Sequence, residues 1–143
     1  MPTQFNDPGQ AVFLFYFIVA LIIETWQEAV RAGFYPSHII PVSLAAYIVN
    51  GQPAERQGGM YAALRDLADN VQSALSEAVS QRLDLPVNIR LFHDGTAAAS
   101  AYAGSPHTAV ITLGTALGIG FPPPSAEMFR PLADPLKITQ WYS

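Results

Sequence analysis

The feature that most restricts the fold is an uninterrupted apolar run near the start of the chain, residues 11–23, with the sequence AVFLFYFIVALII. It is shorter than the roughly 20 residues that a helix needs to cross a hydrocarbon core. No Lys or Arg precedes it, whereas a secretory signal begins with positive charge. We therefore expect a buried helix that becomes amphipathic in its second half and ends at Gly33. The alternative is a helix that associates with a membrane.

The composition allows a substantial core and narrows the possible functions. Half of the 143 residues are hydrophobic and the formal net charge is −4, so we expect one folded domain and no nucleic-acid partner. Cysteine is absent, which removes disulfides, thiolate catalysis and cysteine-based zinc sites. His38, His93 and His107 lack the spacing of metal ligands, so no metal site is expected. These features are compatible with a cytoplasmic protein, and no membrane partner is expected.

Beyond the first helix, patterns typical of strands and helices alternate along the chain. Residues 1–10 are polar and rich in turn formers, which indicates a flexible start. Residues 60–83 have apolar side chains at threes and fours, which predicts one long helix. We expect strands within 38–49, at 87–92, at 108–113 and at 117–121, a short alanine-rich helix at 97–103, and a proline-rich tail at 122–143. Helices interleaved with strands predict an α/β fold.

The first candidate for chemistry is Asp94, which lies between a predicted strand and a predicted helix. A carboxylate in this position lies near helix amides, and the carboxyl end of a strand usually faces the ligand crevice. Such a group can take the proton from a hydroxyl that attacks phosphorus. The alternative, which the spacing alone favours, is that Asp94 only caps the first turn of the helix.

The second candidate is the glycine-rich segment at residues 114–120, GTALGIG, between two apolar strands. Glycines in a tight turn let backbone N–H groups approach an anion, and Thr115 adds a hydroxyl donor. The segment is neither a Walker P-loop nor a dinucleotide fingerprint, because Gly-Lys-Ser/Thr is absent and a strand follows. The alternative is a glycine-bearing hairpin with no ligand.

Taken together and in this order, the two candidates have a more specific pattern. The segment LFHDGTAAASAYAGSPHTAVITLGTALGIGF resembles the actin-like ATPase superfamily, in particular sugar kinases of the ROK (repressor, open reading frame, kinase) and hexokinase types. The resemblance covers mainly residues 86–121 and implies an incomplete ribonuclease H-like core within residues 11–121. It implies a catalytic base at Asp94, contacts with the phosphates of Mg²⁺-ATP at Gly114, Thr115, Gly118 and Gly120, and sugar contacts at His93, Gly95 and Thr96.

The chain also departs from the pattern of these kinases. His93 stands where the family has an Asn that helps to hold the sugar, and Ala116 replaces a common glycine. The family's Asp-x-Gly-x-Thr after a strand is missing, since the nearest string, at residues 7–11, has no threonine. Transfer of phosphate depends mostly on positioning and charge stabilisation. We therefore expect a sugar-kinase fragment or degraded relative that is inactive unless another polypeptide completes it.

A second hypothesis belongs to a different class. A chain that keeps only the core of this fold leaves apolar surface uncovered, which favours self-association. The alternative function is thus a non-catalytic binding or assembly module that forms homo-oligomers.

Overall fold

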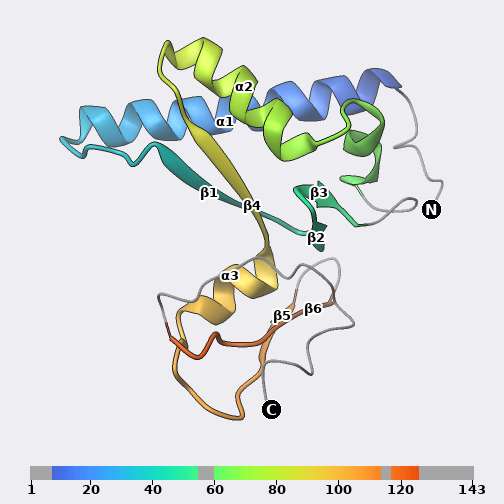
Figure 1. The fold of residues 1–143 in the computed structure, drawn as a ribbon, viewed down its shortest axis with the longest axis vertical. Helices are drawn as coiled ribbons and strands as arrows, with labels where there is room; N and C mark the ends of the chain where they lie inside the picture. The colour runs from blue at the N-terminus through green and yellow to red at the C-terminus, as the bar shows by residue number, and fades with distance from the viewer. Residues whose placement is uncertain (1–7, 55–59, 114–116, 126–143) are drawn as a thin grey trace. The chain divides into compact units, whose positions relative to one another are not determined.

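The computed structural model describes residues 8–54, 60–113 and 117–125. Its elements follow one another in the order α1 (Pro8–Arg31), β1 (Ile39–Leu44), β2 (Ile48–Val49), β3 (Gln52–Pro53), the 3₁₀ helix η2 (Ala62–Asp66), α2 (Val71–Leu83), β4 (Asn88–His93), α3 (Asp94–Ser100), β5 (Val110–Leu113) and β6 (Leu117–Gly120) (Figure 1). The strands pair as β1–β4, β2–β3 and β5–β6. The protein is therefore mixed α/β, as the sequence predicts.

The chain divides into two compact units. The first contains Met1–Pro41 and Gly51–Arg90, and the second contains Val42–Asn50 and Leu91–Ser143. The chain thus leaves the first unit within β1 and leaves it again within β4. The sequence predicted a single partial domain over residues 11–121, without this division.

Both ends of α1 follow from local chemistry. The helix begins at Pro8, three residues before the apolar run, and proline suits the first turn because the N–H it lacks has no helical partner there. At the other end Gly33 adopts φ 85°, which glycine tolerates best. The amide of Phe34 donates to Ala29 O and that of Gly33 to Val30 O, each at 3.0 Å. This is a Schellman motif, and it confirms the predicted end at Gly33.

Among the described residues of its unit, neighbours cover one face of α1. The covered stripe contacts α2 and η2, and its buried residues are Ala11, Ile18, Val19 and Ile22. The opposite face keeps large apolar side chains in solvent, namely Val12, Phe13, Tyr16, Phe17 and Leu21. The expectation of a buried helix is therefore correct for one face and wrong for the other.

The long helix predicted at residues 60–83 is interrupted. η2 ends at Asp66 and α2 begins only at Val71. Asn70 is extended, with φ −144°, and its side chain accepts a hydrogen bond of 2.9 Å from the Ser73 amide. An Asn that caps a new helix competes with continuation of the previous one. The prediction is therefore correct for the second half of the segment and wrong for residues 67–70.

Hydroxyl groups of serines on α2 accept hydrogen bonds from backbone amides at the start of β4. The strand itself pairs with β1. The amide of Ile89 donates to Ser76 Oγ at 2.9 Å, and the amide of Val87 donates to Ser80 Oγ at 3.0 Å. The two serines are one helical turn apart, so they match the amide of Ile89 in the strand and that of Val87 just before it. Because an exposed edge invites pairing with another chain, these contacts also protect β4.

We expect Ser76→Ala to destabilise the protein by about 1–3 kcal/mol, because the amide of fully buried Ile89 would lose its acceptor. Ser73→Ala makes the same change at an exposed position of the same helix and should cost less than about 0.5 kcal/mol. Urea unfolding followed by circular dichroism measures both. Equal stabilities of the two variants would contradict the role assigned to Ser76.

The second unit contains α3 and the β5–β6 hairpin. The two strands are antiparallel, with Val110 opposite Gly120 and Leu113 opposite Leu117, which confirms the predicted pair of strands. α3 packs against both strands, while Ile111 and Leu113 remain exposed. The hairpin is therefore covered on one face and open on the other.

Candidate functional site

The first predicted site residue, Asp94, lies where β4 passes directly into α3. The helix begins at Asp94 rather than at the predicted residue 97, because His93 is extended (φ −69°, ψ 140°) and occupies the N-cap position. Asp94 Oδ1 accepts a hydrogen bond of 2.6 Å from the amide of Gly95. A capping side chain normally accepts from an amide two or three residues further on. The capping interpretation is thus correct only in part. Asp94 accepts a hydrogen bond from one free amide of the first turn, but the N-cap residue is His93.

His93 holds the carboxylate from the buried side. Its Nε2 lies 3.0 Å from Asp94 Oδ1, and its side chain is 6% exposed. The imidazole stacks on the ring of Tyr47, with centroids 4.3 Å apart and an angle of 18° between the planes. Sequence reasoning missed Tyr47, because no spacing pattern connects the segment between β1 and β2 with the end of β4.

The carboxylate is the accessible member of the His93–Asp94 pair. The Asp94 side chain is 40% exposed, compared with 6% for His93. Both short contacts fall on Oδ1, one from the imidazole and one from the Gly95 amide. The group is thus held in one orientation by the protein while part of its surface stays in solvent.

The glycines of β6 bring the hairpin against this carboxylate. A Cβ atom added at Gly120 would lie 1.9 Å from the carbonyl oxygen of Gly95. One added at Gly118 would lie 2.2 Å from Thr112 Oγ1 and 3.3 Å from Asp94 Oδ1. At Gly120 a side chain would meet backbone atoms, and at Gly118 it would have to displace the hydroxyl of Thr112. The two features that the sequence singled out therefore lie together in the second unit.

The other predicted site residues have different surroundings. Gly114 and Thr115 lie outside the described residues. Gly95 and Thr96 are buried in α3, and Thr96 Oγ1 makes no hydrogen bond with any described residue. With His93 also buried, none of the three predicted sugar-contacting residues has a wide surface open to a sugar. Their positions place them around Asp94 instead.

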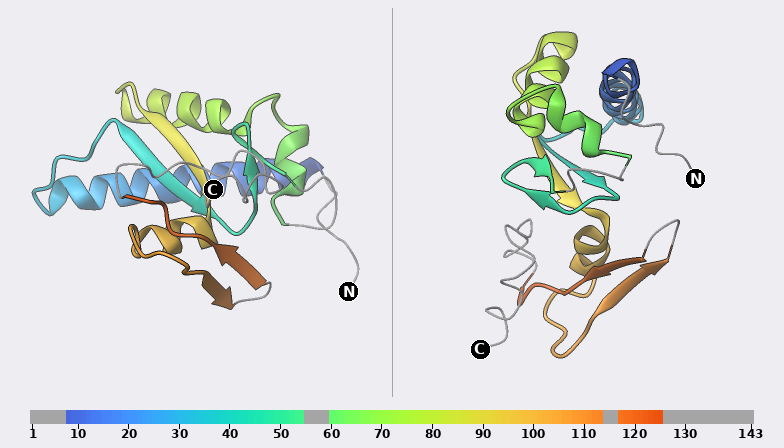
Figure 2. Two further views of the ribbon diagram at one scale, coloured as in Figure 1. Left: turned by 60° about the horizontal axis from the view of Figure 1, so that its bottom comes forward. Right: turned by 90° about the vertical axis from the view of Figure 1, so that its right-hand side faces the viewer.

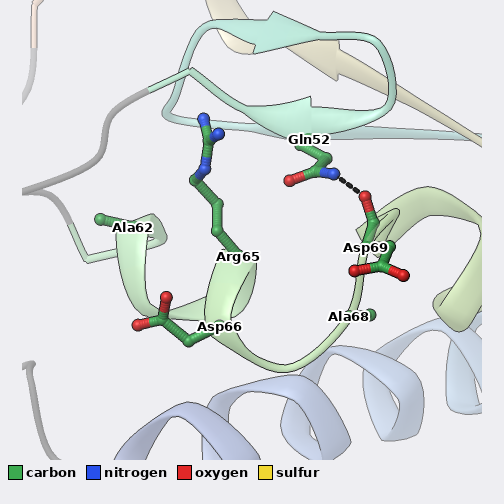
Figure 3. Close-up of a pocket in the computed structure, with 6 residues that line it drawn as sticks. All are labelled: Gln52, Ala62, Arg65, Asp66, Ala68 and Asp69. Carbon is green, nitrogen blue, oxygen red and sulfur yellow. Dashed lines mark hydrogen bonds between the residues drawn. The ribbon is translucent and has the colours of Figure 1, made fainter.

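A polar pocket of about 420 Å³ lies in the first unit (Figure 3). Arg65 Nη1 donates to Pro53 O at 2.9 Å and to Ala54 O at 3.3 Å. Gln52 Nε2 donates to the carbonyl oxygen of Asp69. These bonds tie β3 to η2 and to the segment that leads into α2, so the longest polar side chains of the pocket serve the fold. The pocket is lined by Gln52, Ala62, Arg65, Asp66, Ala68 and Asp69.

Comparisons of the chain with protein-family models, with curated proteins and with solved structures found no match. The actin-like and sugar-kinase interpretation therefore remains a prediction from the sequence.

We expect Gly120→Ala to destabilise the second unit by at least about 2 kcal/mol, because the new methyl group meets backbone that cannot move aside cheaply. Ile111→Ala shortens a side chain on the exposed face of the same hairpin and should cost under about 1 kcal/mol. Urea unfolding compares the two variants. If Gly120→Ala is as stable as Ile111→Ala, the hairpin does not pack on α3 as described.

Proposed function

We propose that the Asp94 end of β4 and the β5–β6 hairpin form part of a phosphoryl-transfer site of the actin-like, sugar-kinase type, on a ribonuclease H-like core. Asp94 acts as the base that deprotonates a sugar hydroxyl, and Mg²⁺-ATP supplies the phosphoryl group. The observation that carries the proposal is the 3.3 Å between Asp94 Oδ1 and a Cβ placed on Gly118. It brings a proton acceptor and a glycine hairpin together.

The surroundings of Asp94 support the role of base. General bases act when they are held in one orientation within reach of the hydroxyl. The imidazole of His93 and the amide of Gly95 hold one carboxylate oxygen, while the side chain keeps 40% of its surface in solvent. We propose that the hydroxyl approaches from this open side.

The hairpin supports the phosphate role in two parts. Gly118 and Gly120 are buried, so their contribution is to let the hairpin pack on α3. We propose that Gly114 and Thr115, outside the described residues, contact the phosphate oxygens, because the resemblance to the sugar kinases implies it. The glycines thus divide between packing and ligand binding.

Two features shape how the site is used. His93 stands where the family has an Asn, and its imidazole turns to Asp94 and Tyr47, so we assign sugar recognition to other groups. The chain also lacks an Asp-x-Gly-x-Thr motif after a strand. We therefore propose that a further segment or a complementing polypeptide supplies the opposite side of the phosphate site, since catalysis of this kind depends on positioning from both sides.

We expect Mg²⁺-ATP to bind the isolated chain weakly, and to shift backbone amide resonances of Leu117–Gly120 and of residues 93–96 in ¹⁵N–¹H spectra. Asp94→Asn should retain these shifts, because the base contacts the sugar hydroxyl rather than the nucleotide. A coupled assay for ADP release with hexoses should show negligible turnover by the chain alone. Shifts confined to the first unit, or no shifts, would contradict the phosphate site.

The role of Asp94 has its own control. Asp66→Asn removes an exposed carboxylate in the other unit and should behave as the unmodified chain. If the chain alone shows turnover, and Asp94→Asn abolishes it while Asp66→Asn does not, the role of Asp94 as the base is supported. The same result would show that no second polypeptide is needed. Turnover that survives Asp94→Asn would contradict the base.

A further inference from the structure

The outer face of α1 carries an apolar patch that no described part of the chain covers. Figure 2 (right) shows α2 along one side of α1 and no described element of the same unit along the other. The rings of Phe13 and Phe17 on this face stack at 6.2 Å. The patch consists of five large side chains that are 43–73% exposed, Val12, Phe13, Tyr16, Phe17 and Leu21.

The patch has a sharp end along the helix. On the same face beyond Leu21 the exposed side chains are mostly polar, beginning with Glu24 and ending with the Glu28–Arg31 ion pair, and Val30 is an apolar exception at 50% exposure. Residues 12–21 extend over about 15 Å, whereas a hydrocarbon core is about 30 Å thick. An apolar patch with a polar margin is the anatomy of a protein interface.

Charge also favours a protein partner over a lipid surface. By length and composition alone, Gly9–Arg31 could cross a membrane, but its other face already packs against α2 and η2. Helices that lie in a membrane surface use Lys and Arg on their polar side. The polar side of α1 carries Glu24, Glu28 and Arg31, and the whole chain has a net charge of −4.

An apolar groove of about 340 Å³ lies beside the stacked rings. Besides Phe13 and Phe17, it is lined by Gln10, Ala11, Leu14, Met60 and Ala63. The groove is therefore formed by α1 together with the start of the η2 segment. Such a concave site next to exposed aromatic rings can receive a side chain from a partner.

We propose that this outer face binds a second copy of the chain, with the two α1 helices antiparallel across a two-fold axis at Tyr16. Tyr16 lies near the middle of the patch, so a two-fold axis there places each patch on the other, as a symmetric dimer requires. Leu21 of one copy then lies opposite Ala11 of the other, at the groove.

The charges of α1 complement each other in this arrangement. Glu24 of one copy lies opposite Pro8, the first residue of the partner helix. The first turn of α1 has no acidic residue of its own, and a carboxylate near a helix N-terminus interacts favourably with the helix dipole. A parallel pair would instead place Glu24 beside the Glu24 of its partner.

The size of the patch sets the strength of the dimer. With about 150–250 Å² for each large side chain, the exposed parts amount to roughly 500 Å² per copy. Two copies bury about 1,000 Å², the lower limit for a specific interface. The dimer is therefore weak and reversible. It does not depend on the proposed function, because the patch and Asp94 belong to different units.

Sedimentation velocity over a range of concentrations tests the proposal. The unmodified chain should form a concentration-dependent dimer, and Phe13→Glu/Phe17→Glu should weaken it at least tenfold while retaining the circular dichroism of the fold. Leu113→Glu places one glutamate at another apolar side chain, 85% exposed on β5, and should dimerise normally. A chain that stays monomeric, or equal effects of the two variants, would overturn the proposal.

The absence of cysteine allows a second test that leaves the patch almost intact. Tyr16→Cys should form a disulfide-linked dimer on mild oxidation, because the axis brings residue 16 to its own copy. Glu28→Cys, on the same face but far from the axis, should not. Crosslinking at 28 but not at 16 would overturn the antiparallel arrangement. Binding of the monomer to phosphatidylcholine vesicles, lost in Phe13→Glu/Phe17→Glu, would assign the patch to lipid instead.

Discussion

The contact between Gly95 and Gly120 is the constraint on which the candidate site depends. A single Cβ at Gly120 would meet the Gly95 carbonyl oxygen at 1.9 Å, so the hairpin reaches the first turn of α3 only because both strand and helix lack side chains there. This contact places β6 beside the carboxylate of Asp94. His93 and Tyr47 then support that carboxylate from the buried side. Without the contact, the carboxylate and the hairpin would be unrelated features.

Local signals in the sequence predicted much of the secondary structure. Gly33 ends α1 through its own backbone conformation, and the strands β5 and β6 lie within the apolar runs on either side of the glycine segment. The interruption at residues 67–70 was missed, because Asn70 and its neighbours also fit the polar side of a helix. The stacking of Tyr47 on His93 was missed for a different reason. It depends on tertiary packing between segments that share no pattern.

Hydropathy alone does not say what covers an apolar surface. The run at residues 11–23 was expected to be buried, yet within the described part of its unit only the stripe through Val19 meets other elements. The opposite face is just as apolar up to Leu21 and becomes mostly polar from Glu24, with Val30 as an exposed apolar exception. The start of β4 is the reverse case, since the hydroxyl groups of two serines of α2, which no sequence pattern singled out, accept hydrogen bonds from its amides. In both places, burial was decided by neighbours rather than by composition.

Nuclear Overhauser contacts in solution test the central claim most directly, because they report proximity without any substitution. We predict cross-peaks from the Hα protons of Gly118 to Hε1 of His93, and from those of Gly120 to the methyl group of Ala99, whose Cβ lies 3.0 Å from a Cβ placed on Gly120. Contacts within the hairpin, such as Leu113 with Leu117, provide the internal reference. Observing these reference contacts without the contacts to His93 and Ala99 would show that the hairpin and Asp94 do not share a site.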